Sequence, residues 1–212
     1  HASLFTGEPP WVHGATFAPF GRSDILASDL SMSLRAMRTD LPTLAERFNA
    51  AGYRSSAFCA NPILREELGL TRGFSAVSVP PASGDGMAPD AEVVGGLSEL
   101  LSLPSSKPEF VFLNLFSAHM PYIETPADWI SEEQRSLLSS PSPPGWLLPF
   151  LFKNPRLGFS GYGYLPGTKI RVNDAFSIGR ISLPREGIDL ATALYDGNVR
   201  LSDHFLLSLI HI

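Results

Sequence analysis

A short, almost uninterrupted apolar run near the middle of the chain limits most strongly what this sequence can fold into. The run, EFVFLNLF at residues 109–116, combines β-branched and aromatic residues over the length of one strand. A strand that is apolar at nearly every position is expected to be covered on both faces, as in a parallel sheet flanked by helices. The rest of the chain therefore has to supply helices for both faces.

The neighbouring segments have the patterns that such a sheet needs. Thr43 and Glu46 have the spacing of a capping box, and Gly52 is placed to end the helix that they begin. Further elements follow in the order strand, helix, strand and helix, at residues 53–60, 90–103, 109–116 and 187–210. This alternation predicts an α/β fold with a mostly parallel sheet and flanking helices.

Composition limits the classes of partner. The chain has 212 residues, of which 44% are hydrophobic and 17% charged, and this is typical of a globular protein with a sizeable core. The net charge is −5, and Lys and Arg are not clustered. Nucleic acids and anionic membrane surfaces are therefore not expected as partners, because both need concentrated positive charge.

Two local features argue against a membrane-spanning segment and against an internal disulfide. The most apolar segment, residues 145–152, is shorter than the about 18 residues needed to cross a bilayer and contains Pro149. Cys59 is the single cysteine, so an internal disulfide is impossible. Cysteine content therefore does not indicate whether the protein works in an oxidising or a reducing compartment. The surroundings of Cys59 favour a small buried hydrophobic residue over a reactive thiol.

Two stretches rich in Pro, Gly and Ser are predicted to be loops. They cover residues 79–90 and 139–167. The second is long for a compact domain, and long irregular segments often form lids or substrate-binding loops.

Two histidines occupy positions of interest. His119 lies about three residues past the expected end of the 109–116 strand, at the sheet edge where ligands of parallel α/β folds gather. Its imidazole could donate a hydrogen bond to an anionic oxygen or protonate a leaving group, or it could be an ordinary surface residue. His13 is expected to cap or pack the turn between Pro10 and Gly14.

Four segments, in order, resemble the sulfatase and alkaline-phosphatase-like superfamily. HASLFTGEPPWVHG, at residues 1–14, resembles the family segment P-S-[RH]-A-S-L-L-T-G-x-x-P-x-x-H-G that follows the nucleophile. Residues 43–74 resemble its T-L-A-E stretch ending in a Gly-Phe pair, and FVFLNLFSAHMPY at 110–122 resembles its strand followed by H-x-P-Y. YDGNVRLSD, at 195–203, resembles its Y-D-x-x-[IV]-x-x-x-D helix.

The resemblance implies an incomplete alkaline-phosphatase-like three-layer sandwich. Residues 1–212 would form a partial sulfatase-like catalytic domain, with an irregular insertion at about 130–184 that the resemblance does not cover. In the family, the nucleophile lies four residues before the position of His1, and acidic metal-binding motifs lie upstream and downstream of the segments matched here. The resemblance thus implies an internal fragment without the nucleophile or the metal ligands. Such a fragment is expected to have open sheet edges and to fold marginally or self-associate.

The resemblance assigns roles to three residues. His119 matches the histidine that contacts the ester or leaving-group oxygen, and Tyr122 of the H-x-P-Y motif is implied in substrate binding. His1 is the second residue implied to be catalytic, since it stands where formylglycine sulfatases have an arginine that supports the nucleophile and the helix start. Because histidine is shorter and not permanently charged, a Ser or Thr nucleophile is an alternative to formylglycine. Asp196 and Asp203 match helix positions of the family rather than its metal motifs, and solvated or capping roles are expected for them. His204 and His211 match nothing and receive no role.

The implied reaction is hydrolysis of a sulfate or phosphate monoester through a covalent sulfo- or phospho-enzyme. A divalent cation, Ca²⁺ or alternatively Mn²⁺ or Zn²⁺, would activate the nucleophile in the complete enzyme, with ligands outside this chain. The substrate would be a small-molecule or glycan ester. Alternatives are a phosphoethanolamine transferase or phosphonate monoester hydrolase of the same fold, or a degenerate domain that binds a partner without catalysis. The isolated 212 residues are expected to be inactive.

Overall fold

A computed structural model describes residues 1–16, 35–61, 63–64, 66–79, 89–119, 122, 125–150, 153–154, 159–160, 179 and 182–210. The chain divides into two compact units. The first comprises residues 1–19, 30–116 and 207–212, and the second comprises residues 20–29 and 117–206.

The first unit is built on a three-stranded parallel sheet. Its strands are β1 (Arg54–Cys59), β2 (Ala76–Ser78) and β3 (Glu109–Asn114), in the order β2-β1-β3. β1 pairs along its full length with β3 but over only three positions with β2. The predicted parallel α/β arrangement is confirmed, whereas β2 was not predicted because it is short and half-exposed.

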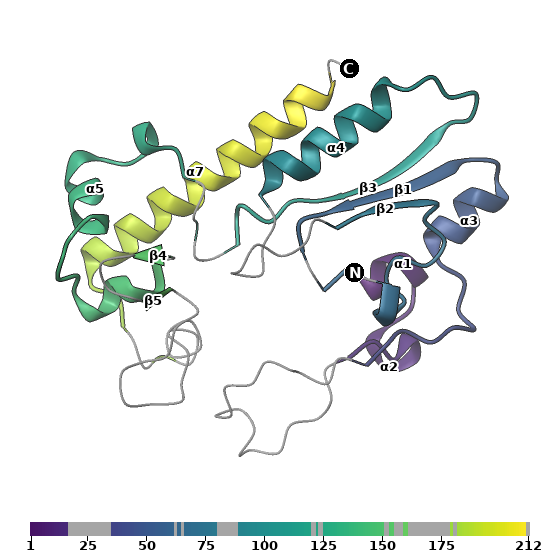
Figure 1. Cartoon of the computed structure of the whole chain (residues 1–212). Coiled ribbons are helices and arrows are strands. Elements are labelled where there is room, and N and C mark those ends of the chain that lie inside the picture. The colour runs from purple at the N-terminus through teal and green to yellow at the C-terminus, as the bar shows by residue number, and fades with distance from the viewer. Residues whose placement is uncertain are drawn as a thin grey trace. The chain divides into compact units, whose positions relative to one another are not determined.

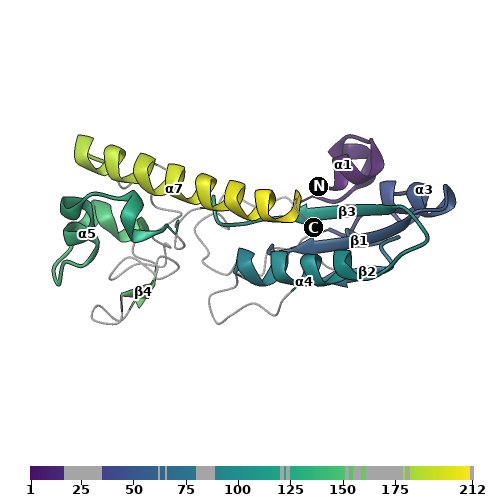
Figure 2. The same cartoon turned by 90° about the horizontal axis from the view of Figure 1, so that it is seen from above.

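Alternate residues of β1 serve opposite faces of the sheet. Ala57 and Cys59 join a buried cluster with Ala2 of α1 (Ala2–Thr6). Phe58 packs on the opposite face with α4 (Asp90–Ser102). Figures 1 and 2 both place α1 and α4 on opposite faces of the sheet. The strand is therefore covered on both sides, as its apolar character requires.

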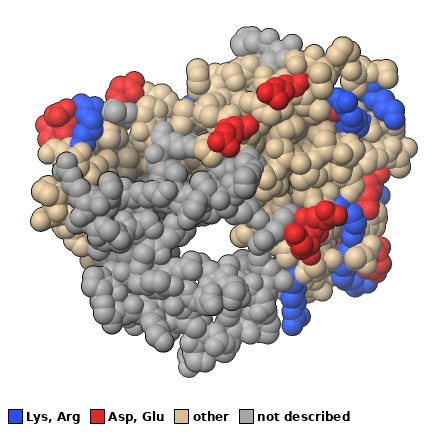
Figure 3. Space-filling model, in the orientation of Figure 1, with Lys and Arg blue, Asp and Glu red and all other residues tan. Residues whose placement is uncertain are grey.

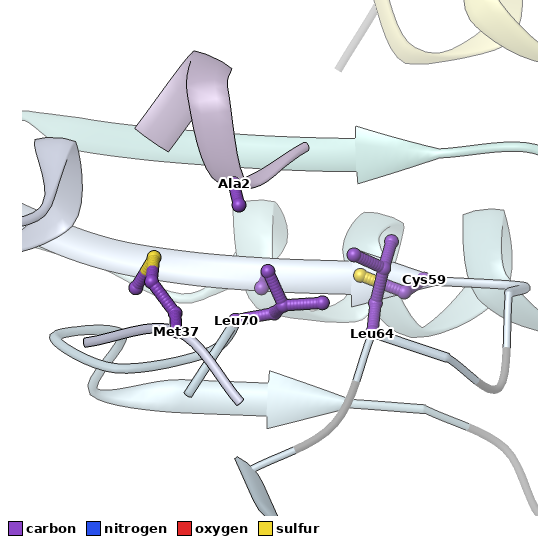
Figure 4. Close-up of a cluster of buried hydrophobic side chains, with 6 residues drawn as sticks. Ala2, Met37, Cys59, Leu64 and Leu70 are labelled. Atoms are coloured by element: carbon purple, nitrogen blue, oxygen red, sulfur yellow. The ribbon is translucent and has the colours of Figure 1, made fainter. Parts of the chain in front are cut away.

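The cluster on the α1 face is compact. In Figure 4, Ala2 points from α1 toward β1, while Met37, Leu64 and Leu70 converge on the same space from the connections that surround the strand. All of these side chains are at most 8% exposed. The cluster fixes the position of α1 against the sheet.

Capping residues and glycines set the ends of the short helices of this unit. α3 (Leu44–Ala50) begins with the predicted capping box, in which Thr43 Oγ1 accepts from the Glu46 N–H at 3.1 Å and Glu46 Oε2 accepts from the Thr43 N–H at 2.7 Å. α1 ends at Gly7, and α2 (Pro10–His13) ends at Gly14, both in the left-handed conformation. A short 3₁₀ turn, η2 (Glu66–Leu68), connects β1 toward β2.

The second unit contains the long helix α7 (Arg185–Ile210), whose last residues belong to the first unit. Its other elements are η3 (Ala127–Trp129), α5 (Glu132–Leu138), η4 (Gly145–Phe150), and the antiparallel pair β4 (Lys153–Asn154) and β5 (Phe159–Ser160). Leu147, Leu190 and Leu194 form its buried core. The helix predicted at 187–210 is confirmed and begins slightly earlier.

Helix α5 lies in the segment that the sequence analysis treats as an irregular insertion, residues 130–184. Ser131 Oγ accepts from the Gln134 N–H at 3.2 Å, and Gln134 Oε1 accepts from the Ser131 N–H at 2.9 Å. This second capping box is readable in the sequence and starts the helix. Of the two predicted loops, residues 80–88 of the first and residues 151–152, 155–158 and 161–167 of the second lie outside the described residues.

Surface charges of both signs are interspersed on the face shown in Figure 3. Ion pairs include Arg54 with Glu109 at 2.6 Å and Arg72 with Glu46 at 3.1 Å. Among the described residues, none of the helices combines the length and apolar character needed to span a membrane.

Candidate functional site

His1 lies at the carboxyl edge of the sheet, at the start of α1. Its Nε2 is 3.4 Å from Nδ2 of Asn114, the last residue of β3, and its ring meets the Phe112 ring edge-on with centroids 5.8 Å apart. Phe5 of α1 holds this position, because it is buried and packs edge-on against Phe112 at 4.8 Å. This packing holds the start of α1 beside the end of β3.

A cavity of about 300 Å³ opens next to His1. Its polar lining residues are His1, Thr16, Arg35 and Asn61, and its apolar lining residues are Ala2, Ala15, Ile63, Leu68 and Leu70. Asn61 follows β1, and its Oδ1 accepts a hydrogen bond from the Ile63 N–H at 3.0 Å, which turns the chain at this edge. A cavity at the carboxyl ends of parallel strands is the expected place for a ligand.

Cys59 lies near this edge but is chemically quiet. Its side chain is 1% exposed, and burial raises the pKa of the thiol to about 12. The thiolate that a nucleophile needs is therefore scarce at neutral pH. The prediction of a small buried hydrophobic residue is confirmed.

His13 is a structural residue, as predicted. Its Nδ1 accepts from the Ala15 N–H at 3.0 Å, which leaves the proton on Nε2, 3.0 Å from Ser3 Oγ. Because Nε2 carries the proton, this pair is not a serine activated by a basic histidine. Burial of the imidazole lowers the pKa of His13 below its ordinary value of 6.5.

The lowered pKa of His13 predicts that the fold loses stability as the pH falls below about 6.5. In that range the unfolded chain binds a proton at this position and the folded chain does not, so the loss continues down to the folded pKa and then levels off. Urea unfolding at pH 7.5 to 5.0 should show a flatter pH dependence for His13→Gln than for the original chain. The exposed His204→Gln is the control, and an unchanged slope in His13→Gln would contradict the prediction.

His119 and Tyr122 belong to the second unit. β3 ends at Asn114, two residues earlier than predicted, so His119 lies further from the strand than the sequence analysis expects. His119 is exposed, and its carbonyl accepts from the Tyr122 N–H at 3.2 Å, which closes a turn. Pro121 lies outside the described residues. His1 belongs to the first unit. The three residues of the predicted site are therefore divided between the two units, and each part is described separately.

Tyr122 has an unusual backbone for a non-glycine residue, with φ +56°. Its half-buried ring meets Tyr195 of α7 edge-on, with centroids 5.9 Å apart. The pKa of the Tyr122 hydroxyl is raised, mainly by burial of the side chain and to a smaller extent by the nearby Tyr195. A strained residue held by packing is typical of a functional turn.

A polar clamp between Thr125 and α7 holds this turn and was not predicted from the sequence. Thr125 Oγ1 lies 3.3 Å from the Tyr122 carbonyl oxygen and 3.1 Å from that of Leu194, and the fully buried Asn198 donates to Thr125 Oγ1. Gly197 permits the close approach, since a Cβ there would lie 2.5 Å from Thr125 Cγ2. The Gly-Asn pair inside the Y-D-x-x-V motif was the available signal.

Asp90 is a second residue with a missed role. Its position in the sequence predicts only the start of a helix. In the structure Asp90 is 1% exposed, and its Oδ1 accepts a hydrogen bond from the Phe116 N–H at 2.7 Å. Asp90 thereby ties the first turn of α4 to the chain leaving β3. This is the stretch that leads toward His119.

The acidic residues of α7 do not form a metal site. Asp196 and Asp203 are exposed, as their predicted solvated role requires, and His204 is exposed as well. His211 lies outside the described residues. Within the described ranges, His, Cys, Asp and Glu form no group of three or more that could hold a metal ion. The resemblance places the ligands of its divalent cation outside this chain.

Comparisons of the chain with protein families, curated proteins and solved structures find no match.

Proposed function

We propose that this chain is part of a sulfatase-like hydrolase that cleaves sulfate or phosphate monoesters through a covalent enzyme intermediate. The observation that carries the proposal is the position of His1. The residue that would follow the nucleophile segment begins α1 at the carboxyl edge of a parallel sheet, against Asn114 and beside a cavity. Such an edge is where parallel α/β enzymes bind their substrates. An alkaline-phosphatase-like sandwich would extend this sheet on either side.

Two histidines would act on the ester. His1 would hydrogen-bond an ester oxygen at the start of α1, and His119 would donate a hydrogen bond or a proton to the leaving-group oxygen. The clamp formed by Thr125 and Asn198 would hold the turn that carries His119. The nucleophile and the cation ligands implied by the resemblance would come from residues outside this chain.

The test is to read the coding DNA on both sides of these 212 residues and to express the whole reading frame. We expect a Cys, Ser or Thr shortly before His1, acidic motifs on both flanks, and hydrolysis of 4-nitrophenyl sulfate or phosphate. His119→Ala should lower kcat at least about 100-fold, because a positioned proton donor contributes a factor of that order. His204→Ala is the matched control.

The isolated chain should show no turnover with Ca²⁺, Mn²⁺ or Zn²⁺. Flanks without a nucleophile and acidic motifs, or a whole protein that hydrolyses neither ester, would overturn the proposal and favour a domain that only binds. Cation-dependent turnover by the 212 residues alone would also contradict it, since the nucleophile would then lie within them.

A further inference from the structure

The cavity beside His1 has an unusual charge. Arg35 and His1 are among the residues that line it, and its lining contains no carboxylate from the described part of the chain. The chain as a whole carries a net charge of −5, and the charged residues that line a larger cavity of about 700 Å³ in the same unit are Glu66, Glu67 and Arg72. A cationic recess in an acidic protein favours an anionic ligand.

Arg35 has its positive charge available for such a ligand. It is exposed, and none of the ion pairs found within the described ranges involves it. By contrast, the neighbouring Arg38 pairs with Asp40 at 2.5 Å. The backbone of Arg35 is held in place, because its N–H donates to the Thr16 carbonyl oxygen at 2.9 Å.

Arg35 and His1 line the cavity from two different segments of the chain. His1 contacts Asn114 on β3. The segment that contains Arg35 runs along the connection between β1 and β2, where the Met37 N–H donates to the Leu68 carbonyl oxygen at 2.9 Å. Because both residues line the same cavity, a ligand with one anionic group near His1 can extend a second one to Arg35.

We infer that the cavity binds esters whose leaving group carries a second negative charge, such as a carboxylate, and that Arg35 selects for it. The inference rests on the proposed function, in which the ester group lies at His1. The apolar floor formed by Ala2, Leu68 and Leu70 would contact the body of the leaving group. Arg35 is therefore a specificity-determining residue for the substrate class.

The test compares phenyl sulfate with 3-carboxyphenyl sulfate, which differ only in the carboxylate. Dissociation constants for the full 212-residue chain are measured by NMR titration at low salt. We expect 3-carboxyphenyl sulfate to bind about fivefold more tightly or better, as for a partly exposed charge pair. Arg35→Gln should abolish the preference, Arg35→Lys should keep part of it, and 0.5 M NaCl should weaken it.

The exposed Arg47→Gln on α3 is the matched control and should keep the preference. Equal affinity of the original chain for both esters would overturn the inference and leave the proposed function standing. Equal weakening of both esters in Arg35→Gln would place Arg35 on the sulfate itself and would also overturn it. If neither ester binds, the inference fails, whereas the proposed function is judged on the whole reading frame, which would carry the nucleophile and the cation ligands.

Discussion

Replacing Gly73 by alanine is expected to destabilise the first unit by about 3 to 5 kcal/mol. Gly73 has φ +91°, a conformation that L-residues rarely adopt. A Cβ there would lie 2.7 Å from the Glu46 backbone nitrogen and 3.0 Å from Thr43 Oγ1. Both atoms belong to the capping box, so neither can move without breaking the start of α3.

The matched control is Gly52→Ala. Gly52 has the same φ of +91°, but no atom lies within 4 Å of the position that its Cβ would take. This variant should lose only the backbone preference, about 1 to 2 kcal/mol. Urea unfolding of both variants separates the two costs, and equal losses would show that the contact with the capping box contributes nothing.

This arrangement explains why two distant motifs occur together. Arg72 donates from Nε to Glu46 Oε1 at 3.1 Å and from Nη1 to the Arg38 carbonyl oxygen at 3.0 Å, while its own carbonyl accepts from Thr43 Oγ1 at 2.9 Å. The T-L-A-E and R-G-F segments therefore form one hydrogen-bonded unit around the helix start. These hydrogen bonds give a physical reason why the two segments occur together.

Much of the fold could be predicted because local signals and burial agree. The apolar run of β3 and the capping box of α3 each identify their element without tertiary information. β2 was not predicted, because three half-exposed residues carry too little periodicity and its pairing with β1 is a long-range contact. α5 was not predicted, because its capping box lies close to a segment rich in proline and serine, which is typical of a loop.

The candidate site was harder to predict than the fold. The position of His1 at the sheet edge depends on Phe5 packing against Phe112, a contact between residues far apart in sequence. Arg35 has no motif around it, so its place on the cavity could be read only from the structure. Asn198 and Asp90 are polar residues in helices, which a sequence reading assigns to solvent or to a helix start.

Asp90 gives the second large expected effect. Asp90→Ala should destabilise the chain by about 2 to 4 kcal/mol, because it leaves the Phe116 N–H without its carboxyl acceptor and removes an acidic group from the first turn of α4. Urea unfolding gives the loss. Asp90→Asn keeps an oxygen that can accept from the Phe116 N–H, so it should lose about 1 kcal/mol.

Glu92→Ala separates the contribution of the helix start from that of the tie to β3. Glu92 is an exposed acidic residue in the same first turn, so its removal should cost less than about 1 kcal/mol. Hydrogen exchange at the Phe116 amide provides the local readout, which should accelerate in Asp90→Ala and stay slow in Glu92→Ala. Equal exchange rates in the two variants would mean that Asp90 acts only on the helix, and the path from β3 toward His119 would need another anchor.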